Sequence, residues 1–418
     1  MEKTKLRELI LDQQELFEKM DKLIEREVSL DKFMKSDEIV IITGIRRCGK
    51  SSLLKIISRN LEKFVYINFD DVRFTDFKWE NFEDIEEIIS EIHGIKTKIV
   101  YLLDEIQNVP SWERWINNLY SKKIKVFVTG SNSSLLSSEI STFLTGRKRI
   151  LKLYPFSFKE FLLFKEIKID YKTTDERRLI SQSFNYYFEN GGFPLVIKND
   201  DILLSKQYFE DIVNRDIVKR YGVRKIKEIN DLFLYLFSNV SQIYSYSTLK
   251  QVSGIKSPSM IKNYIEYLKN VFVASTINKF DYSIKKQTIS SSKFYALDNS
   301  FLKTVAFNFS ENKGKRLENL VFVELVRRGL EVYYHNKKNE CDFVIKKGLK
   351  ITEAIQVCLN LDNPLTKKRE IDGLLDALKE YGLEEGLILT LDQEEKITTE
   401  NKKIIVKPVW KWLLEEVK

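Results

Sequence analysis

The stretch Glu38-Ile-Val-Ile-Ile-Thr-Gly44-Ile-Arg-Arg-Cys-Gly49-Lys50-Ser51-Ser52 decides the fold, because it reads as a buried strand running into G-x-x-x-x-G-K-S and then a helix. The two glycines let successive backbone N–H groups turn toward phosphate oxygens, Lys50 adds a positive charge, and Ser51 supplies a hydroxyl for Mg²⁺. A chance match on a surface loop is disfavoured, since strand, loop and helix follow in the required order. The residues predicted to hold a nucleotide are Gly44, Ile45, Arg46, Arg47, Cys48, Gly49, Lys50, Ser51 and Ser52.

Composition sets broad limits on the rest of the chain. At 418 residues with 43% hydrophobic side chains, the length favours two or three domains, each with its own core. The net charge of +8 is compatible with nucleic acid without requiring it. Cysteines at 48, 341 and 358 and histidines at 93 and 335 lie far apart, which argues against a disulfide framework or a zinc site. With no signal core and no apolar run long enough to cross a bilayer, we expect a reduced, cytoplasmic setting without a membrane.

Residues 38–130 alternate between strand and helix patterns, which predicts a parallel sheet covered on both faces. An amphipathic helix is expected before them, over residues 4–27. Expected strands cover Ile39–Thr43, Phe64–Phe69, Lys98–Leu103 and Lys125–Thr129, and expected helices cover 50–60, 82–92 and 112–120.

The third of these strands ends in Asp104-Glu105, at the edge of the sheet where ligands of such folds bind. We expect Asp104 to hold Mg²⁺ through a water and Glu105 to polarise the water that attacks a γ-phosphate. Adjacent acids are common on surfaces, but here they lie downstream of a phosphate loop with a strand and a helix between, which favours a site.

Two further motifs suggest a family. Gly146-Arg147 precedes a strand, and Pro155-Phe-Ser-Phe-Lys-Glu-Phe161 follows it. Together with the phosphate loop and the acid pair, they make the chain resemble prokaryotic and archaeal AAA-type P-loop ATPases that carry an ATPase module, a winged helix and a C-terminal restriction-endonuclease-like domain. The resemblance implies an α/β fold: a P-loop (ASCE/AAA-type) parallel sheet with a helical lid, a winged helix-turn-helix, and a C-terminal α/β restriction-endonuclease-like domain. The implied domains are 1–155, 156–228, 229–311 and 312–418.

The resemblance also implies two roles near the phosphates. A polar sensor is expected at the end of the fourth strand, where Ser131 and Asn132 are the candidates, the alternative being a turn that caps the next helix. Arg147 is the candidate arginine finger, acting from a neighbouring subunit or in cis, the alternative being a solvated arginine on a basic loop. Arg46 and Arg47 are second candidates for a charge role.

The pattern from 229 to 300 predicts three short helices and a two-stranded wing, similar to a winged helix-turn-helix whose third helix enters a major groove. Its cations are few: Lys262 and Lys269 on the helix, and Lys279, Lys285 and Lys286 on the wing. Non-specific phosphate contact and a purely protein-packing role therefore both stay open.

From Lys313 the order of helix and strands resembles the PD-(D/E)XK nuclease fold, in which carboxylates and a lysine bind Mg²⁺ and orient water. Glu318 and Asp342 match its first two positions. Gln356 stands where the lysine would be and Ala354 where the second carboxylate would be, while Glu353 should point away from Gln356 because strand side chains alternate. Such a set would bind Mg²⁺ poorly, so a degenerate, inactive nuclease site is expected.

The leading hypothesis is an ATPase using ATP and Mg²⁺, which couples nucleotide state to DNA binding or remodelling. The alternatives are a signalling or scaffold ATPase that binds a protein partner, and an ATP-regulated nuclease. A finger acting in trans would imply a homo-oligomer. The residues do not decide between ATP and GTP.

Overall fold

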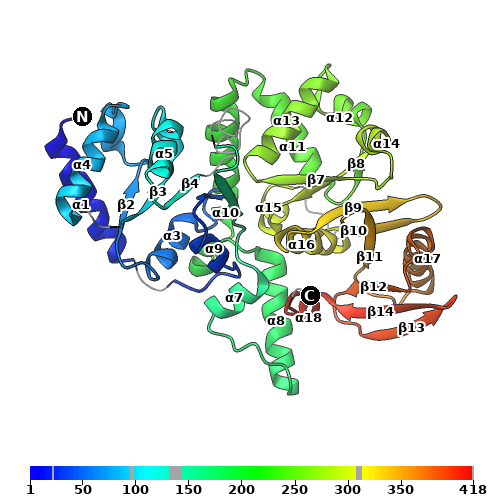
Figure 1. Cartoon of the computed structure of the whole chain (residues 1–418). Helices are drawn as coiled ribbons and strands as arrows, with labels where there is room; N and C mark the ends of the chain where they lie inside the picture. Colours follow the sequence, from blue (N-terminus) through cyan, green and yellow to red (C-terminus); the bar gives the residue numbers. More distant parts are fainter. Residues whose placement is uncertain (21–22, 95–97, 131–143, 307–312, 417–418) are drawn as a thin grey trace. The chain divides into compact units, whose positions relative to one another are not determined.

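The structure, a computed structural model, describes residues 1–20, 23–94, 98–130, 144–306 and 313–416 (Figure 1). The chain folds into two units. The first comprises Met1–Pro155 with Asn270–Phe272, and the second comprises Phe156–Lys269 and Val273–Lys418. None of the described helices combines the length and the apolar character needed to span a bilayer.

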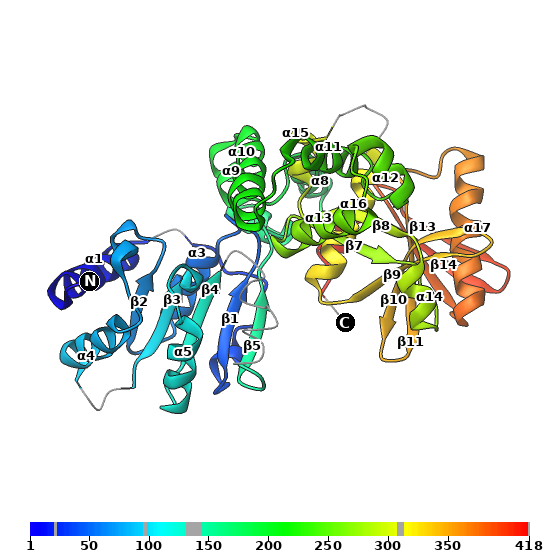
Figure 2. The same ribbon diagram turned by 90° about the horizontal axis from the view of Figure 1, so that it is seen from above.

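A five-stranded sheet forms the centre of the first unit, and all its strands run parallel, as predicted. Figure 2 shows the strands side by side in the order β2-β3-β4-β1-β5. Because β4 lies between β1 and β3, one strand separates the phosphate loop from the acid pair at the same edge of the sheet. The strands are β1 (Ile39–Thr43), β2 (Phe64–Asn68), β3 (Val100–Asp104), β4 (Val126–Gly130) and β5 (Lys148–Lys152).

Alternation of side chains along these strands divides the core between two faces of the sheet. Ile39, Ile41, Ile67 and Leu103 belong to one hydrophobic cluster with residues of α1, α4 and α5. The intervening residues, such as Ile42, point to the opposite face and are also buried. The helices of this unit are α1 (Lys3–Glu18), α2 (Asp31–Met34), α3 (Lys50–Ser58), α4 (Asn81–His93) and α5 (Trp112–Ser121).

Helix α1 is shorter than the predicted 4–27, because it ends at Glu18 and residues 23–30 are not helical. Arg26 lies in the non-helical segment after α1. Its guanidinium donates to the carbonyl of Cys48 in the phosphate loop at 3.1 Å and to the carbonyl of Tyr154, after β5, at 2.7 Å. Helix α1 itself lies along β2. Gln13 and Gln14 accept hydrogen bonds from the Asn68 and Tyr66 amides at 2.9 and 3.0 Å, along the outer side of the sheet's edge strand.

The second unit begins with helices, as predicted. Helices α7 and α8 start with capping boxes, in which Ser157 pairs with Glu160 and Thr173 pairs with Glu176. The helices are α7 (Phe158–Phe164), α8 (Thr174–Asn190), α9 (Pro194–Asn199) and α10 (Leu203–Asp211), the last continuing into a π-helical segment, Ile212–Lys219.

Three helices and a small antiparallel sheet follow. They are α11 (Ile226–Ser238), α12 (Tyr246–Ser253), α13 (Pro258–Asn270), β6 (Ile243–Tyr244), β7 (Ala274–Asn278) and β8 (Ser292–Ala296), with the sheet order β6-β8-β7. The three helices and the β7–β8 pair were predicted. The third strand β6 was not, and neither was helix α14 (Ile284–Ile289), which lies in the connection between β7 and β8. The short helix α15 (Asn299–Thr304) comes next.

The C-terminal part of the chain contains a six-stranded mixed sheet, with its strands in the order β13-β14-β12-β11-β10-β9. Helix α17 packs on it through Leu374, Leu375 and Leu378, which share a cluster with Val344 and Ile388. The elements are α16 (Lys313–Arg327), β9 (Glu331–Asn336), β10 (Glu340–Lys347), β11 (Lys350–Val357), α17 (Pro364–Tyr381), β12 (Glu385–Thr390), β13 (Glu395–Thr399), β14 (Lys402–Pro408) and α18 (Val409–Leu413).

Candidate functional site at the phosphate loop

The loop between β1 and α3 has the backbone geometry that its glycines allow. A Cβ on Gly44 would lie 2.0 Å from the Leu153 carbonyl oxygen, so no other residue fits where the loop passes the end of β5. Gly49 has φ of 100°, a conformation that L-residues rarely adopt, and it directly precedes α3. The loop therefore curls tightly against the sheet and leads into a helix N-terminus.

Three side chains of this segment hold the phosphate loop in place, two by burial and one by hydrogen bonds. Ile45 and Cys48 are buried, and burial raises the pKa of the Cys48 thiol, which leaves it an apolar anchor. Lys50, at the start of α3, donates through Nζ to the carbonyls of Gly44 and Ile45 at 3.1 and 3.2 Å. Its ammonium group is thus held within the curl of the loop.

The loop and the acid pair meet, because the Ser51 side chain lies close enough to Asp104 to oppose the rise in the pKa of that carboxyl. Tyr66 donates to Asp104 Oδ2 at 2.9 Å, and Thr129 donates to Asp104 Oδ1. Burial raises the pKa of Asp104, and the hydrogen bonds from Ser51 and Thr129 oppose this by favouring the charged form. A buried carboxylate is therefore held next to the serine hydroxyl by two donors, Tyr66 and Thr129.

Glu105 occupies a strained position at the end of β3, with φ of 49°. Its amide donates to Thr129 Oγ1 at 3.0 Å, and its carboxylate accepts from Gln107 Nε2 at 2.5 Å. Its backbone is therefore tied to β4, and its side chain is oriented separately from that of Asp104.

Three residues of this site were missed by sequence reasoning: Tyr66, Thr129 and Arg26. Thr129 was visible as a polar residue ending an apolar strand, two positions before the expected sensor. Tyr66 and Arg26 belong to patterns that read as strand and helix, and only the fold brings them to Asp104 and Cys48. Ser131 and Asn132, the predicted sensor candidates, lie outside the described residues.

Arg147 directly precedes β5, so it lies at the amino ends of the parallel strands, whereas the phosphate loop lies at their carboxyl ends. Its carbonyl accepts from the Ile39 amide at 2.9 Å, and β5 pairs with β1 from Ile39 opposite Lys148 to Thr43 opposite Lys152. The length of these strands puts Arg147 roughly 15 Å from the phosphate loop of its own chain. Its guanidinium donates to Asn117 Oδ1 and lies 5.7 Å from the Tyr120 ring centroid, both on α5.

The donor set fits a magnesium nucleotide. Hydroxyl and carboxylate oxygens of Ser51 and Asp104 are the hard ligands that Mg²⁺ prefers. Helix α3 begins directly after Gly49, and the backbone N–H groups of a helix N-terminus at such a loop suit a phosphate chain.

The C-terminal candidates divide into two sets. Glu318 on α16 and Asp342 on β10 come together and are both buried. Gln356 is also buried, but it hydrogen bonds to the Asp342 amide and to Glu370. Glu353 points away, as expected, and pairs with Lys347 at 3.3 Å.

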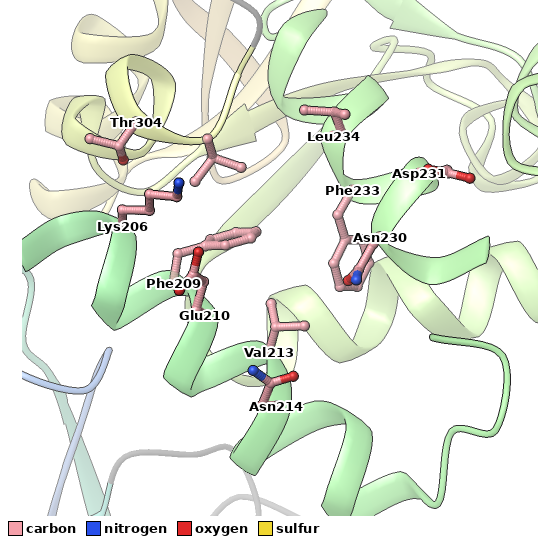
Figure 3. Close-up of a pocket in the computed structure, with 11 residues that line it drawn as sticks. Lys206, Phe209, Glu210, Val213, Asn214, Asn230, Asp231, Phe233, Leu234 and Thr304 are labelled. Carbon is pink, nitrogen blue, oxygen red and sulfur yellow. The ribbon is translucent and has the colours of Figure 1, made fainter. Parts of the chain in front are cut away.

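A separate cavity of about 340 Å³ lies in the second unit (Figure 3). Phe209 and Val213 on one side and Phe233 of α11 on the other form its apolar floor, and Lys206 and Glu210 stand on its rim. The ring centroids of Phe209 and Phe237 lie 5.1 Å apart, so Phe209 belongs both to the cavity wall and to a cluster of aromatic side chains. No sequence pattern pointed to this cavity.

Family models match two segments of the chain. Residues 36–162 match the AAA domain, and residues 181–312 match a domain of unknown function (DUF8612). The solved structure of the Aeropyrum pernix ORC1 protein in complex with DNA covers 78% of this chain and 93% of its own at 12% identity, but its TM-score of 0.29 is too low to establish a shared overall fold or ligand.

Two uncharacterised proteins match over nearly their whole length. The Haemophilus influenzae protein is 31% identical over 92% of this chain and 96% of its own. MJ1544 of Methanocaldococcus jannaschii is 36% identical over 97% of this chain and 94% of its own. The chain therefore belongs to the family of MJ1544, and its first unit carries an AAA-type P-loop domain.

Proposed function

We propose that the chain is a Mg²⁺-dependent ATPase of AAA type that couples its nucleotide state to DNA binding or remodelling. The observation that carries the proposal is the contact between Ser51 of the phosphate loop and Asp104 of β3, with Lys50 held in the same loop. Phosphate-binding and metal-binding groups from two separate motifs thus meet at one edge of the sheet.

Each residue has a distinct task in this proposal. Loop amides and Lys50 bind the β- and γ-phosphates, while Ser51 and Asp104 hold Mg²⁺, which neutralises charge on those phosphates. Glu105 accepts the proton of the attacking water. The polar sensor is proposed at Ser131 or Asn132, while Thr129 positions the acid pair, because it contacts both Asp104 and the Glu105 amide.

Arg147 acts in trans. Its place at the opposite end of the strands from its own phosphate loop supports action on a neighbouring subunit's phosphate loop over a cis finger. We therefore propose a head-to-tail homo-oligomer.

Partner binding is assigned to the second unit, with the division 156–228 as lid, 229–311 as winged helix and 312–418 as PD-(D/E)XK-like domain. Lys262 on α13 and Lys285 and Lys286 on α14 are exposed, which supports contact with DNA phosphates. Lys269 is less available, because it pairs with Glu266 at 2.8 Å. Contact without base specificity fits this sparse set of cations.

A protein partner is the second candidate. Helix α14 exposes Ile284 at 80% and Ile289 at 75%, and neighbouring Tyr282 is exposed as well. Large apolar side chains gathered on a short exposed helix favour a signalling or scaffold ATPase that docks a protein there.

ATP turnover measured with single-stranded, duplex and junction DNA separates these candidates. We expect DNA to raise turnover several-fold, and the increase to fade between about 50 and 200 mM salt as phosphate contacts weaken. Turnover that is indifferent to all three DNAs would favour the protein partner. Lys50→Ala is the control for contaminating ATPase, and turnover that survives in this variant would contradict the phosphate-loop assignment.

Tyr66→Phe tests the support of the metal carboxylate. Tyr66 stacks on Phe17 of α1 with ring centroids 3.8 Å apart and donates to Asp104, so loss of its hydroxyl frees one carboxylate oxygen. We expect turnover at limiting Mg²⁺ to fall about tenfold, since hydrogen bonds to charged groups contribute about 1.5–3 kcal/mol.

Saturating Mg²⁺ should restore most of the turnover of Tyr66→Phe. The matched control is Tyr101→Phe, a buried tyrosine on the neighbouring strand β3. An equal loss in both variants, or a loss that Mg²⁺ does not relieve, would show that the hydroxyl does not position Asp104.

A further inference from the structure

A buried ion cluster lies in the second unit, away from the phosphate loop. Lys293 on β8 places its Nζ 3.1 Å from Glu318 Oε1 and 3.2 Å from Asp342 Oδ1, and 2.7 Å from Glu340 Oε1. Lys293 is 1% exposed, Glu318 8% and Asp342 7%. One ammonium group thus bridges carboxylates from a helix and a strand.

Both carboxylates also accept hydrogen bonds from other groups of the chain. Tyr295 donates to Glu318 Oε1 at 2.7 Å, and the Val357 amide donates to Asp342 Oδ2 at 3.0 Å. Asp342 lies in a bulge, since the β9–β10 ladder shifts register between Cys341 and Val344, and this turns its carboxylate toward Lys293.

Both polar atoms of the Gln356 side chain also have hydrogen-bond partners within the chain. Its Oε1 accepts from the Asp342 amide at 3.1 Å, and its Nε2 donates to Glu370, which pairs with Arg369. It therefore supplies neither a metal ligand nor the missing lysine. Among the described residues, no group of three or more His, Cys, Asp and Glu side chains is arranged to hold a metal ion.

The pKa shifts of Glu318 and Lys293 show how the positive charge acts between the two buried carboxyl groups. Burial, followed by the Asp342 carboxylate, raises the pKa of Glu318 to about 8, although Lys293 opposes both effects. Burial alone would lower the pKa of Lys293, but the groups around it, led by Glu318, raise it well above its ordinary range. The acids thus stabilise the charged form of Lys293, and Lys293 opposes the burial that raises the pKa of Glu318 and of Asp342.

We propose that the Lys293 ammonium permanently occupies the position of a divalent cation between Glu318 and Asp342, so that this site binds no metal and joins two sheets instead. The three-stranded sheet is anchored here to α16 and β10. The junction continues nearby, where Asn319 exchanges two hydrogen bonds with Ala296 of β8 at 2.8 and 3.0 Å.

The opposite role, in which Lys293 completes an active nuclease site, conflicts with burial. A phosphodiester must reach the metal and both carboxylates, and here both carboxylates are buried. We therefore expect residues 312–418 to lack nuclease activity.

Manganese binding to the full chain without nucleotide tests the proposal, with electron paramagnetic resonance of free Mn²⁺ and thermal unfolding as readouts. The wild type should bind no Mn²⁺ that depends on Asp342. Lys293→Met should unfold about 10 °C lower in chelator, because breaking a buried ion pair is strongly destabilising. It should gain one Asp342-dependent Mn²⁺ site and recover stability when Mn²⁺ is added.

Two controls separate charge from packing. Lys346→Met removes a surface lysine that pairs with Glu331, and it should change neither readout. The triple variant Lys293→Met/Glu318→Gln/Asp342→Asn lacks the buried charges, so it should recover much of the lost stability without Mn²⁺ and should bind none.

Four results would overturn the proposal: wild-type Mn²⁺ binding abolished by Asp342→Asn, Mn²⁺-dependent nicking of supercoiled DNA abolished by the same change, a folded Lys293→Met that gains no Mn²⁺ site, or a triple variant no more stable than Lys293→Met. The first two use folded wild-type protein as reference. They therefore decide the question even where Lys293→Met is insoluble.

Discussion

Glu105→Gln should lower ATP turnover by about 10²- to 10⁴-fold, the range typical of a lost general base, while ATP still binds. Glutamine has the same shape but cannot accept the proton of the attacking water. Lys50, Ser51 and Asp104 remain in place, and the amide can still accept from Gln107. Phosphate release measures turnover, and isothermal titration with Mg²⁺-ATP measures binding.

The matched control for this experiment is Glu113→Gln, a carboxylate in the first turn of α5 that takes no part in the proposed site. It should retain wild-type turnover. Weakened ATP binding in Glu105→Gln in proportion to its lost turnover would mean that Glu105 binds the nucleotide and is not the base.

Arg147→Ala should lower turnover by about 10³-fold or more, as loss of an arginine finger does, with ATP binding in each subunit unchanged. Because Arg147 lies at the opposite end of the strands from its own phosphate loop, the loss should be repaired from another chain. Mixing Arg147→Ala with Lys50→Ala, each inactive alone, should restore turnover at about a quarter of the interfaces of a randomly mixed head-to-tail assembly.

Arg149→Ala is the control on the same strand, since Arg149 forms a surface ion pair with Glu38 at 3.0 Å. It should behave as wild type. An Arg147→Ala protein that cannot be rescued by mixing would contradict action in trans. Wild-type turnover in Arg147→Ala would show that Arg147 has only a structural role, through its contacts with Asn117 and Tyr120.

Local patterns were enough to predict the phosphate loop and the strands of the first unit. Each of those strands is a short apolar run bounded by turns, and the order of strand, Gly-rich loop and helix is one that chance rarely produces. The position of Asp104 followed from the same logic, because carboxyl ends of parallel strands meet at one edge.

Residues that act through tertiary contacts could not be found in this way. Tyr66 looked like an ordinary strand residue, and Lys293 like the start of a wing strand, because nothing in their neighbourhood in sequence signals a carboxylate across a sheet. The helix predicted over residues 4–27 was too long for a related reason: Leu23 and Ile24 keep a helical spacing, but the bonds of Arg26 to the Cys48 and Tyr154 carbonyls outweigh it.

The two glutamines of α1 have a consequence beyond the nucleotide site. Strand β2 is at the margin of the sheet, and an open margin invites strand addition by a second copy of the chain. Gln13 and Gln14 occupy the backbone donors at Asn68 and Tyr66 that such a copy would pair with. The first helix thereby also guards the protein against self-association into extended aggregates.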